Sequence, residues 1–270
     1  MGQVRRRWLC GLGALVTAGA LLGQAGMAAA GPGVAARAAV PGRAVVSASV
    51  SASAPEPAAA PAYVPPGRIL ALGMRGPAVR SLQERLAALR YYPGRIDGQF
   101  GLDTLEAVWA FKEVQGFPVN RANQDVVSRA TERALVHPRA PKVLVPRGGR
   151  MRIEINMGHE VLVLYKNSKV SLISHVSTGA GCLPGEGCGW NTPTGNYRAL
   201  SFYPGWIQVP LGQMYNSVFF ISTVYAIHGE YDSSVPFYPD SHGCVRIPFD
   251  TATFFHRLIN VPGTPIYIRH

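Results

Sequence analysis

The sequence predicts a multidomain protein, with a small three-helix module followed by a mainly β, sandwich-like domain. Apolar residues recur at three- and four-residue steps from Val79 to Leu89, the period of an amphipathic helix. After Arg150 the pattern changes to short apolar, β-branched runs separated by turn formers, which is typical of a sandwich or barrel-like sheet. At 270 residues, 47% of them apolar, the chain has room for both cores.

Residues 1–30 are predicted to be a secretory signal. Arg5 to Arg7 form a positive start, Leu9 to Leu22 form an apolar stretch, and Ala28 to Ala30 offer small residues for cleavage. The apolar stretch is short for a membrane span, and an uncleaved N-terminal anchor is the competing interpretation. We therefore expect a secreted protein that acts in the cell wall or elsewhere outside the cytoplasm.

Residues 31–66 are predicted to be a disordered linker of Ala, Pro, Ser and Val, with seven prolines and three charged residues. Without the signal's three arginines, the chain has 23 basic and 15 acidic residues, a net charge of +8. A basic secreted protein suits an acidic polymer surface such as a cell wall. Nucleic acid is discounted as a partner, because the charge is scattered and the protein leaves the cytoplasm.

Residues 67–137 are predicted to form the helical module. Pro77 is well placed as the first residue of the first helix. The second helix is expected to end at Gly116, and the third to span 125–135 with Asp125 as its N-cap.

The module carries a recognisable pattern over residues 70–119. They read LALGMRGPAVRSLQERLAALRYYPGRIDGQFGLDTLEAVWAFKEVQGFPV, which nearly completes LGxxGxxVxxLQxxL and DGxFGxxTxxAVxxFQxxxG. The module thus resembles the peptidoglycan-binding domain type 1, although Lys112-Glu113 stands where that family often has Gln. The resemblance implies docking onto glycan strands. We expect the apolar stripes to be core, and ligand contacts to come from the loops around Asp97 and the exposed helix ends.

Residues 150–270 are predicted to form the mainly β domain, after a second linker at 138–149. Arg152 to Asn156 alternates as a half-buried strand does. A short helix is expected at 250–259, with Asp250 as its N-cap. Further strands are expected over the other apolar runs, at 161–165, 170–176, 197–202, 218–227, 245–247 and 264–268.

Reactive side chains gather between Ala226 and Ile247. His228 ends one predicted strand, and Ser241-His242-Gly243-Cys244 opens the next, so adjacent strands would bring His228 and Cys244 together at one end of a sheet. A thiol beside an imidazole is the minimum for nucleophilic acyl transfer, because the neighbouring His generates the thiolate. Backbone N–H groups of the turn are the nearest donors for an oxyanion. Spacing alone does not decide whether His228 or His242 is the base.

The other cysteines are predicted to be structural. Cys182 and Cys188 lie in a glycine-rich loop, and we expect them to pair as a local disulfide in an oxidising compartment. Cys244 then remains as a free thiol, which mildly favours a chemical role.

The β domain resembles the L,D-transpeptidase catalytic domain, also called YkuD. The resemblance rests on four pieces of sequence in the family's order: STG at 177–179, TPTG at 192–195, His228-Gly229, and SHGCVR at 241–246. It implies a β-sandwich enzyme that needs neither metal nor cofactor. Such an enzyme passes the acyl group of a peptidoglycan tetrapeptide stem to a diamino-acid amine on a neighbouring stem. It also implies inhibition by carbapenem-type β-lactams.

The resemblance assigns a role to each matching residue. Cys244 matches the nucleophile, and His228 the proton acceptor, oriented by the Gly229 carbonyl. The remaining matches are His242 and Gly243 on the oxyanion side, Ser241 as a hydrogen-bonding support and Arg246 as a substrate or structural contact. One departure is the segment 180–191, which is longer than the family's short turn. It either shapes the substrate groove or is a stapled hairpin tip.

Four alternatives remain open from the sequence. His228, His242 and Cys244 could be three zinc ligands, although no fourth ligand stands out. A sortase would also use His, Cys and Arg, but its TLxTC-like strand is absent. The β domain could be a degenerate part of a wall-binding protein. Water as the acceptor would make the enzyme an L,D-carboxypeptidase that trims stems.

Overall fold

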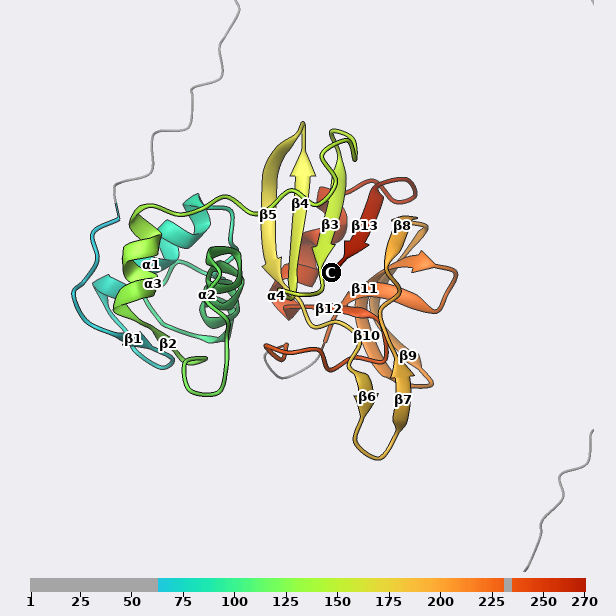
Figure 1. The fold of residues 1–270 in the computed structure, drawn as a ribbon, viewed down its shortest axis with the longest axis horizontal. Coiled ribbons are helices and arrows are strands. Elements are labelled where there is room, and N and C mark those ends of the chain that lie inside the picture. Colours follow the sequence, from blue (N-terminus) through green and yellow to red (C-terminus); the bar gives the residue numbers. More distant parts are fainter. Residues whose placement is uncertain (1–62, 231–234) are drawn as a thin grey trace, which may run out of the picture. The chain divides into compact units, whose positions relative to one another are not determined.

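The computed structural model describes residues 63–230 and 235–270, which belong to one compact unit, 55–270 (Figure 1). The predicted signal and nearly all of the predicted linker at 31–66 lie outside the described residues. Tyr63, in the range predicted as linker, is buried in the core of the helical module, so the packed part begins before residue 67. In the described part of the chain, no helix is long and apolar enough to cross a membrane.

The N-terminal module contains the three predicted helices and a small sheet. The helices are α1 (Pro77–Ala88), α2 (Leu102–Gln115) and α3 (Arg129–Val136). Strands β1 (Leu70–Ala71) and β2 (Val126–Val127) pair antiparallel. Gly116 ends α2 with a φ of 79°, a left-handed conformation that glycine adopts without strain.

The third helix begins later than predicted. Asp125 is not its N-cap, because Val126 and Val127 pair with β1 and β-branched residues suit an extended backbone. Ser128 caps the helix instead, and its Oγ accepts a hydrogen bond from the Thr131 N–H at 3.2 Å.

The C-terminal domain consists mainly of two sheets, which confirms the predicted mainly β class. The order of the larger sheet is β5-β4-β3-β13-β8, and that of the smaller sheet is β12-β11-β10-β9. The larger sheet comprises β3 (Arg152–Asn156), β4 (Val161–Lys166), β5 (Lys169–His175), β8 (Gly195–Arg198) and β13 (Pro265–Arg269). The smaller one comprises β9 (Ser201–Val209), β10 (Gly212–Ile221), β11 (Tyr225–Gly229) and β12 (Val245–Ile247). A separate hairpin pairs β6 (Gly181–Leu183) with β7 (Gly187–Trp190).

Two predicted strands are wrong in extent. The run 197–202 divides between β8 and β9, which lie in different sheets. The run 218–227 divides near Ser222, whose φ of 47° lies in the turn from β10 to β11. Both runs pack against the same apolar core on each side of the break, so their composition does not mark the turn.

The two sheets share one apolar core. Large aliphatic and aromatic side chains from both sheets meet there, and each stabilises the fold by about 1.5–3 kcal/mol when fully buried. They include Ile153, Ile155, Leu162, Leu164, Val218, Phe220, Ile227, Val245, Ile266 and Ile268. This core holds β11 and β12, the strands that flank the reactive residues.

Helix α4 spans Phe249–Phe255 and continues as a short 3-10 turn at His256–Leu258. Asp250 is not the predicted N-cap, because it already lies in the first turn, and the N-cap position is occupied by Pro248. Phe255 is buried against the sheets, and Phe254 and Leu258 are half-buried beside it.

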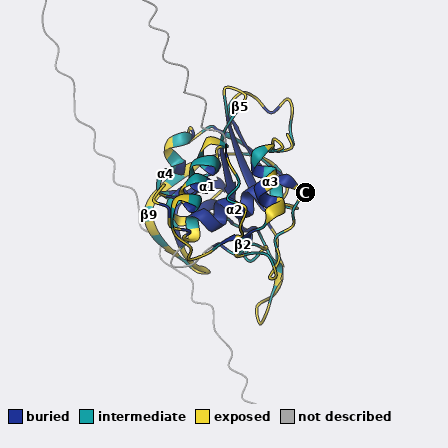
Figure 2. Ribbon diagram, turned by 90° about the vertical axis from the view of Figure 1, so that its left-hand side faces the viewer, coloured by how far each residue is buried: buried dark blue, intermediate teal, exposed yellow. Residues whose placement is uncertain are grey.

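The outer face of the larger sheet is covered by helix α2. Figure 2 colours most of this helix as buried, and its apolar residues share a core with Val161, Val163, Tyr165 and Ile173 of β4 and β5. The outward face of β3 is covered instead by the preceding segment, where the N–H groups of Leu144 and Val145 donate to Glu154. Strand β3 is thus buried on both faces, and the half-buried prediction was wrong. Its outward residues Arg152 and Glu154 form a buried ion pair, with Nε and Oε1 2.6 Å apart.

Candidate active site

Strands β11 and β12 bring His228 and Cys244 to one cavity. The strands are parallel neighbours, with His228 opposite Arg246, and Cys244 directly precedes β12. Both side chains line a cavity of about 420 Å³. The strand arrangement thus places the two residues together, as the sequence predicted.

The walls of the cavity come from separate parts of the chain. The β6–β7 hairpin contributes Trp190, the β9–β10 hairpin contributes residues 209–214, and the β10–β11 turn contributes residues 223–225. Apolar walls with a few polar groups at the reactive end are typical of a ligand site.

His228 is buried and has a fixed tautomer. Its Nδ1 lies 2.8 Å from the Gly229 carbonyl oxygen, which can only accept, so Nδ1 carries the proton and Nε2 has a free lone pair. Burial lowers the pKa of His228 to about 4, the Gly229 hydrogen bond opposes this, and the charge of Arg246 adds to it. The imidazole is therefore neutral above that pH. Gly229 must lack a side chain, since a Cβ there would lie 2.6 Å from that of Ala252.

Cys244 is a free, half-buried cysteine. Burial raises the pKa of its thiol, whereas the Ala226 backbone and Arg246 oppose the rise and Glu230 adds to it. The resting pair is a neutral thiol and a neutral imidazole. The thiolate expected from the sequence is not the resting form, so the proton has to leave the thiol during the attack.

The turn before Cys244 is held by Ser241. The Ser241 Oγ donates to the Cys244 carbonyl oxygen at 2.6 Å and accepts from the Gly243 N–H at 3.0 Å. Gly243 has a φ of 118°, and a Cβ there would lie 2.5 Å from the Tyr225 ring. Because its N–H is already bonded, Gly243 is not the oxyanion donor in this conformation.

The STG and TPTG pieces hold the same turn from the other side. The Thr178 carbonyl oxygen accepts from the N–H groups of Asp240 and Ser241, at 3.0 and 2.9 Å. The Thr192 hydroxyl donates to the Gly243 carbonyl oxygen and accepts from the Gly179 N–H, both at 2.8 Å. These two motifs therefore act as supports of the SHGC turn.

Glu160 is a support that the sequence analysis missed. It is buried, and its two carboxylate oxygens accept from the N–H and the hydroxyl of Thr178, both at 2.6 Å. Burial raises the pKa of Glu160 to about 7, and the two Thr178 hydrogen bonds oppose this. No motif or periodic pattern marks this position in the sequence.

His242 contacts the disulfide hairpin. Cys182 and Cys188 are bonded to each other across β6 and β7. Glu186, in the tip of this hairpin, places its Oε2 2.6 Å from the His242 Nε2, and the Trp190 ring meets the imidazole edge-on at 4.7 Å. The segment 180–191 thus forms one wall of the cavity, and Glu186 is a second residue that the sequence analysis missed.

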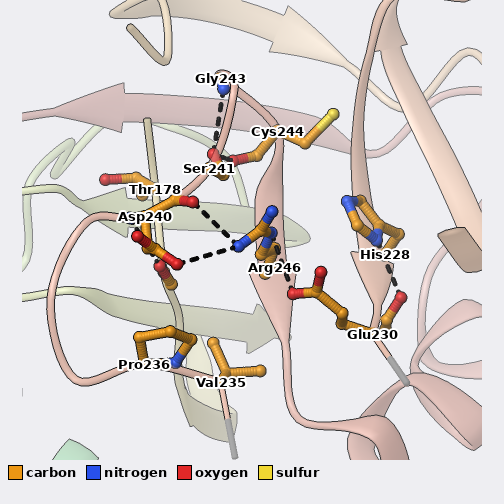
Figure 3. A network of polar contacts seen from close by, with 12 residues as sticks. Thr178, His228, Glu230, Val235, Pro236, Asp240, Ser241, Gly243, Cys244 and Arg246 are labelled. Atoms are coloured by element: carbon orange, nitrogen blue, oxygen red, sulfur yellow. Dashed lines mark hydrogen bonds and ion pairs between the residues drawn. The ribbon is translucent and has the colours of Figure 1, made fainter. Parts of the chain in front are cut away.

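Arg246 is tied to two carboxylates. Its Nε lies 3.0 Å from the Glu230 Oε2, and its Nη1 donates to the Asp240 carbonyl oxygen at 2.9 Å and lies 3.6 Å from the Asp240 carboxylate (Figure 3). These contacts give Arg246 a structural role, and Arg246 also lines the cavity, where the predicted substrate contact would lie. Glu230 also lines the cavity and was missed; burial raises its pKa and Arg246 opposes the rise.

No metal site is evident within residues 63–230 and 235–270, because no three His, Cys, Asp or Glu side chains group to hold an ion there.

Comparison with known proteins matches two families. Residues 75–120 match a putative peptidoglycan binding domain, and residues 150–268 match the L,D-transpeptidase catalytic domain, YkuD. No curated protein is similar enough to count as a relative.

Several solved structures of L,D-transpeptidases are similar to this chain, to different degrees. An L,D-transpeptidase from Xylanimonas cellulosilytica is 28% identical over 76% of this chain and all of its own, with a TM-score of 0.66. One from Stackebrandtia nassauensis is 16% identical over 74% of this chain and 94% of its own, with a TM-score of 0.43. L,D-transpeptidase 3 from Mycobacterium tuberculosis, in complex with a faropenem-derived adduct, is 13% identical over 45% of this chain and 60% of its own, with a TM-score of 0.38.

The Xylanimonas structure covers most of this chain and agrees with the match to the L,D-transpeptidase catalytic domain. Residues 150–268 of this chain therefore match the L,D-transpeptidase catalytic domain, and a match to a peptidoglycan-binding domain precedes them.

Proposed function

We propose that this protein is a secreted enzyme that cross-links peptidoglycan by cysteine-dependent L,D-transpeptidation. The observation that carries the proposal is the placement of a free cysteine, Cys244, and a buried neutral imidazole, His228, in one cavity of an L,D-transpeptidase domain. The peptidoglycan-binding domain supports peptidoglycan as the partner.

In the first half-reaction the Cys244 Sγ attacks the carbonyl carbon of the stem's third residue. The thiol proton passes to the Nε2 of His228, whose lone pair is free because Nδ1 donates to Gly229. An N–H of the SHGC turn other than that of Gly243 stabilises the oxyanion. The carbon–nitrogen bond then breaks, the leaving amine takes the proton from His228, and a thioester remains.

In the second half-reaction the amine of a diamino acid on another stem attacks the thioester. Its proton passes to His228, the carbon–sulfur bond breaks, and Cys244 leaves as a thiol with that proton. The new amide bond joins the two stems, and the enzyme returns to its starting state.

The neutral resting pair suits an enzyme outside the cytoplasm. Thiolates react with oxidants far faster than thiols do, and burial raises the pKa of Cys244. A nucleophile that ionises only during attack is protected between turnovers. The Cys182–Cys188 disulfide also fits an oxidising compartment, in agreement with the predicted signal.

The test is the reaction of purified tetrapeptide muropeptides with the chain lacking residues 1–30, analysed by mass spectrometry. The control is the same protein carrying Cys244→Ala. A cross-linked dimer that requires Cys244 would support the proposal. Tripeptide alone would mean that water is the acceptor, and unchanged substrate from folded protein would refute both activities.

We also propose that carbapenem-type β-lactams acylate Cys244. The attack that Cys244 would make on a stem carbonyl would also open the strained ring of a β-lactam and leave the opened ring on the sulfur as a thioester. Intact mass after exposure should rise by one inhibitor in the wild type and stay unchanged in Cys244→Ala. An unchanged wild-type mass would reject the idea.

A further inference from the structure

Helix α2 of the peptidoglycan-binding module contacts the segment that leads to the nucleophile. Glu106 lies on α2, and its Oε1 accepts a hydrogen bond from the Val235 N–H at 2.6 Å, across 129 residues of sequence. Both residues are buried, so water does not compete for the N–H of Val235.

Trp109 makes the second contact, nearly one turn further along α2. Its buried ring meets Phe237 edge-on at 5.7 Å and His175 edge-on at 5.3 Å. His175 in turn has its Nε2 2.8 Å from the Pro236 carbonyl oxygen. Three consecutive residues of the segment, 235–237, are thus held by α2 directly or through His175.

The same segment continues into the reactive turn. The Tyr238 carbonyl oxygen accepts from the Ser177 hydroxyl at 2.8 Å, and the Ser241 hydroxyl donates to the carbonyl of Cys244 at 2.6 Å. Figure 3 shows Val235 and Pro236 on the loop that leads to Asp240 and the Cys244 turn. A displacement of residues 235–237 would therefore move the turn that carries the Cys244 thiol.

We propose that Glu106 and Trp109 are positioning residues for the reaction, through which the peptidoglycan-binding module sets the geometry of the Cys244 turn. On this view the module contributes to turnover as well as to docking. The inference rests on the proposed function of Cys244 for its catalytic meaning.

The negative charges near Glu106 favour the protonated form of its carboxyl group. Asp103, on the same helix, and Asp250, on α4, are the charged groups that act on it. Burial raises the pKa of Glu106 to about 8, the bond from Val235 opposes this, and the two aspartates add to it. A neutral Glu106 resembles glutamine, so Glu106→Gln should keep the acceptor oxygen for Val235.

The experiment compares Glu106→Ala and Glu106→Gln in the chain lacking residues 1–30. Glu84→Ala is the matched control, because Glu84 lies on α1 of the same module in an exposed pair with Arg80. Hydrogen exchange of residues 235–247 and the rate of Cys244 alkylation by iodoacetamide report the turn. The kcat and KM for cross-linking report turnover.

We expect Glu106→Ala to speed exchange at Val235 by roughly tenfold or more, since its buried N–H loses its partner. Alkylation of Cys244 should become faster, and kcat should fall with little change in KM. Glu106→Gln and Glu84→Ala should stay within about twofold of the wild type. Between about pH 4.5 and about pH 8 the wild-type protection of the segment, corrected for the intrinsic exchange rate, should decline, because the closed state holds a proton on Glu106 that the opened state releases, and that of Glu106→Gln should not.

The proposal is overturned if folded Glu106→Ala exchanges and alkylates like the wild type, or if Glu106→Gln is as impaired as Glu106→Ala. If Glu106→Ala does not fold, the pH comparison of the wild type with Glu106→Gln decides, and an equal change in the two proteins between about pH 4.5 and about pH 8 overturns it. Absence of cross-linking by the wild type would refute the proposed function instead, and exchange and alkylation would still test the positioning of the turn.

Discussion

Replacing Thr192 by valine removes a hydroxyl that joins two motifs of the site. Thr192 is 2% exposed, and its Oγ1 binds the Gly179 N–H and the Gly243 carbonyl, both at 2.8 Å. Valine has nearly the same shape, so the space stays filled while both backbone groups lose their partner. The variant thus isolates hydrogen bonding from packing.

The expected loss follows from those two groups. A buried polar group without a partner costs about 1–3 kcal/mol, so Thr192→Val should lower the free energy of unfolding by about 2–6 kcal/mol. In a unit of this size each kcal/mol lowers Tm by about 2–4 °C, so Tm should fall by at least about 4 °C. The turn before Cys244 should loosen, and cross-linking should slow.

Urea unfolding followed by tryptophan fluorescence measures the stability, and muropeptide turnover measures the activity. Thr192→Ser is the control, because it keeps the hydroxyl and loses a methyl group worth about 1 kcal/mol. A Thr192→Val protein within about 0.5 kcal/mol of the wild type would contradict the reasoning. So would a Thr192→Ser protein that is equally destabilised, because the hydroxyl would then not be the cause.

Three further predictions use simple assays. The rate of Cys244 alkylation should keep rising as the pH passes 9, the ordinary pKa of a thiol, because burial raises the pKa of Cys244. A rate that levels off at neutral pH would instead indicate a thiolate paired with protonated His228. Glu186→Gln should change the free energy of unfolding by less than about 1 kcal/mol, because the pair with His242 is partly exposed. It should nevertheless raise the KM for stem peptide, and an unchanged KM would contradict a role in the cavity wall. Arg246→Met should lower the free energy of unfolding by about 1–3 kcal/mol, because two carboxylates lose their counter-charge. If the variant instead loses activity at full stability, Arg246 is a substrate contact.

Local chemistry explains which elements could be predicted. Pro77 and Gly116 mark the ends of helices because proline suits a first helical turn and glycine a left-handed end. The sequence does not identify Ser128 as the N-cap, because Asp125, three residues earlier, offers the same capping chemistry. Only the pairing of Val126 and Val127 with β1 distinguishes the two candidates. The break at Ser222 could not be predicted, because no glycine or proline marks the turn there.

The residues of the site also divide into those that the sequence marks and those that only the tertiary structure brings together. Cys244 and His228 stand in short motifs, and their roles remain proposals drawn from those motifs and the cavity. Glu160 and Glu186 do not stand in any motif, and Glu106 occupies a variable position of one. Each is matched to a backbone or ring group, which lies 18, 56 or 129 residues away.

The sequence by itself determined the two-domain order, the mainly β class and the motif that carries the free thiol. These properties depend on periodicity, composition and turn chemistry, which act over a few residues. Only the tertiary structure decided that β3 is buried on both faces, that the disulfide hairpin forms one wall of the cavity and that α2 contacts the segment before Cys244. Such contacts depend on packing between distant segments, and burial sets the protonation of His228 and Cys244 for the same reason.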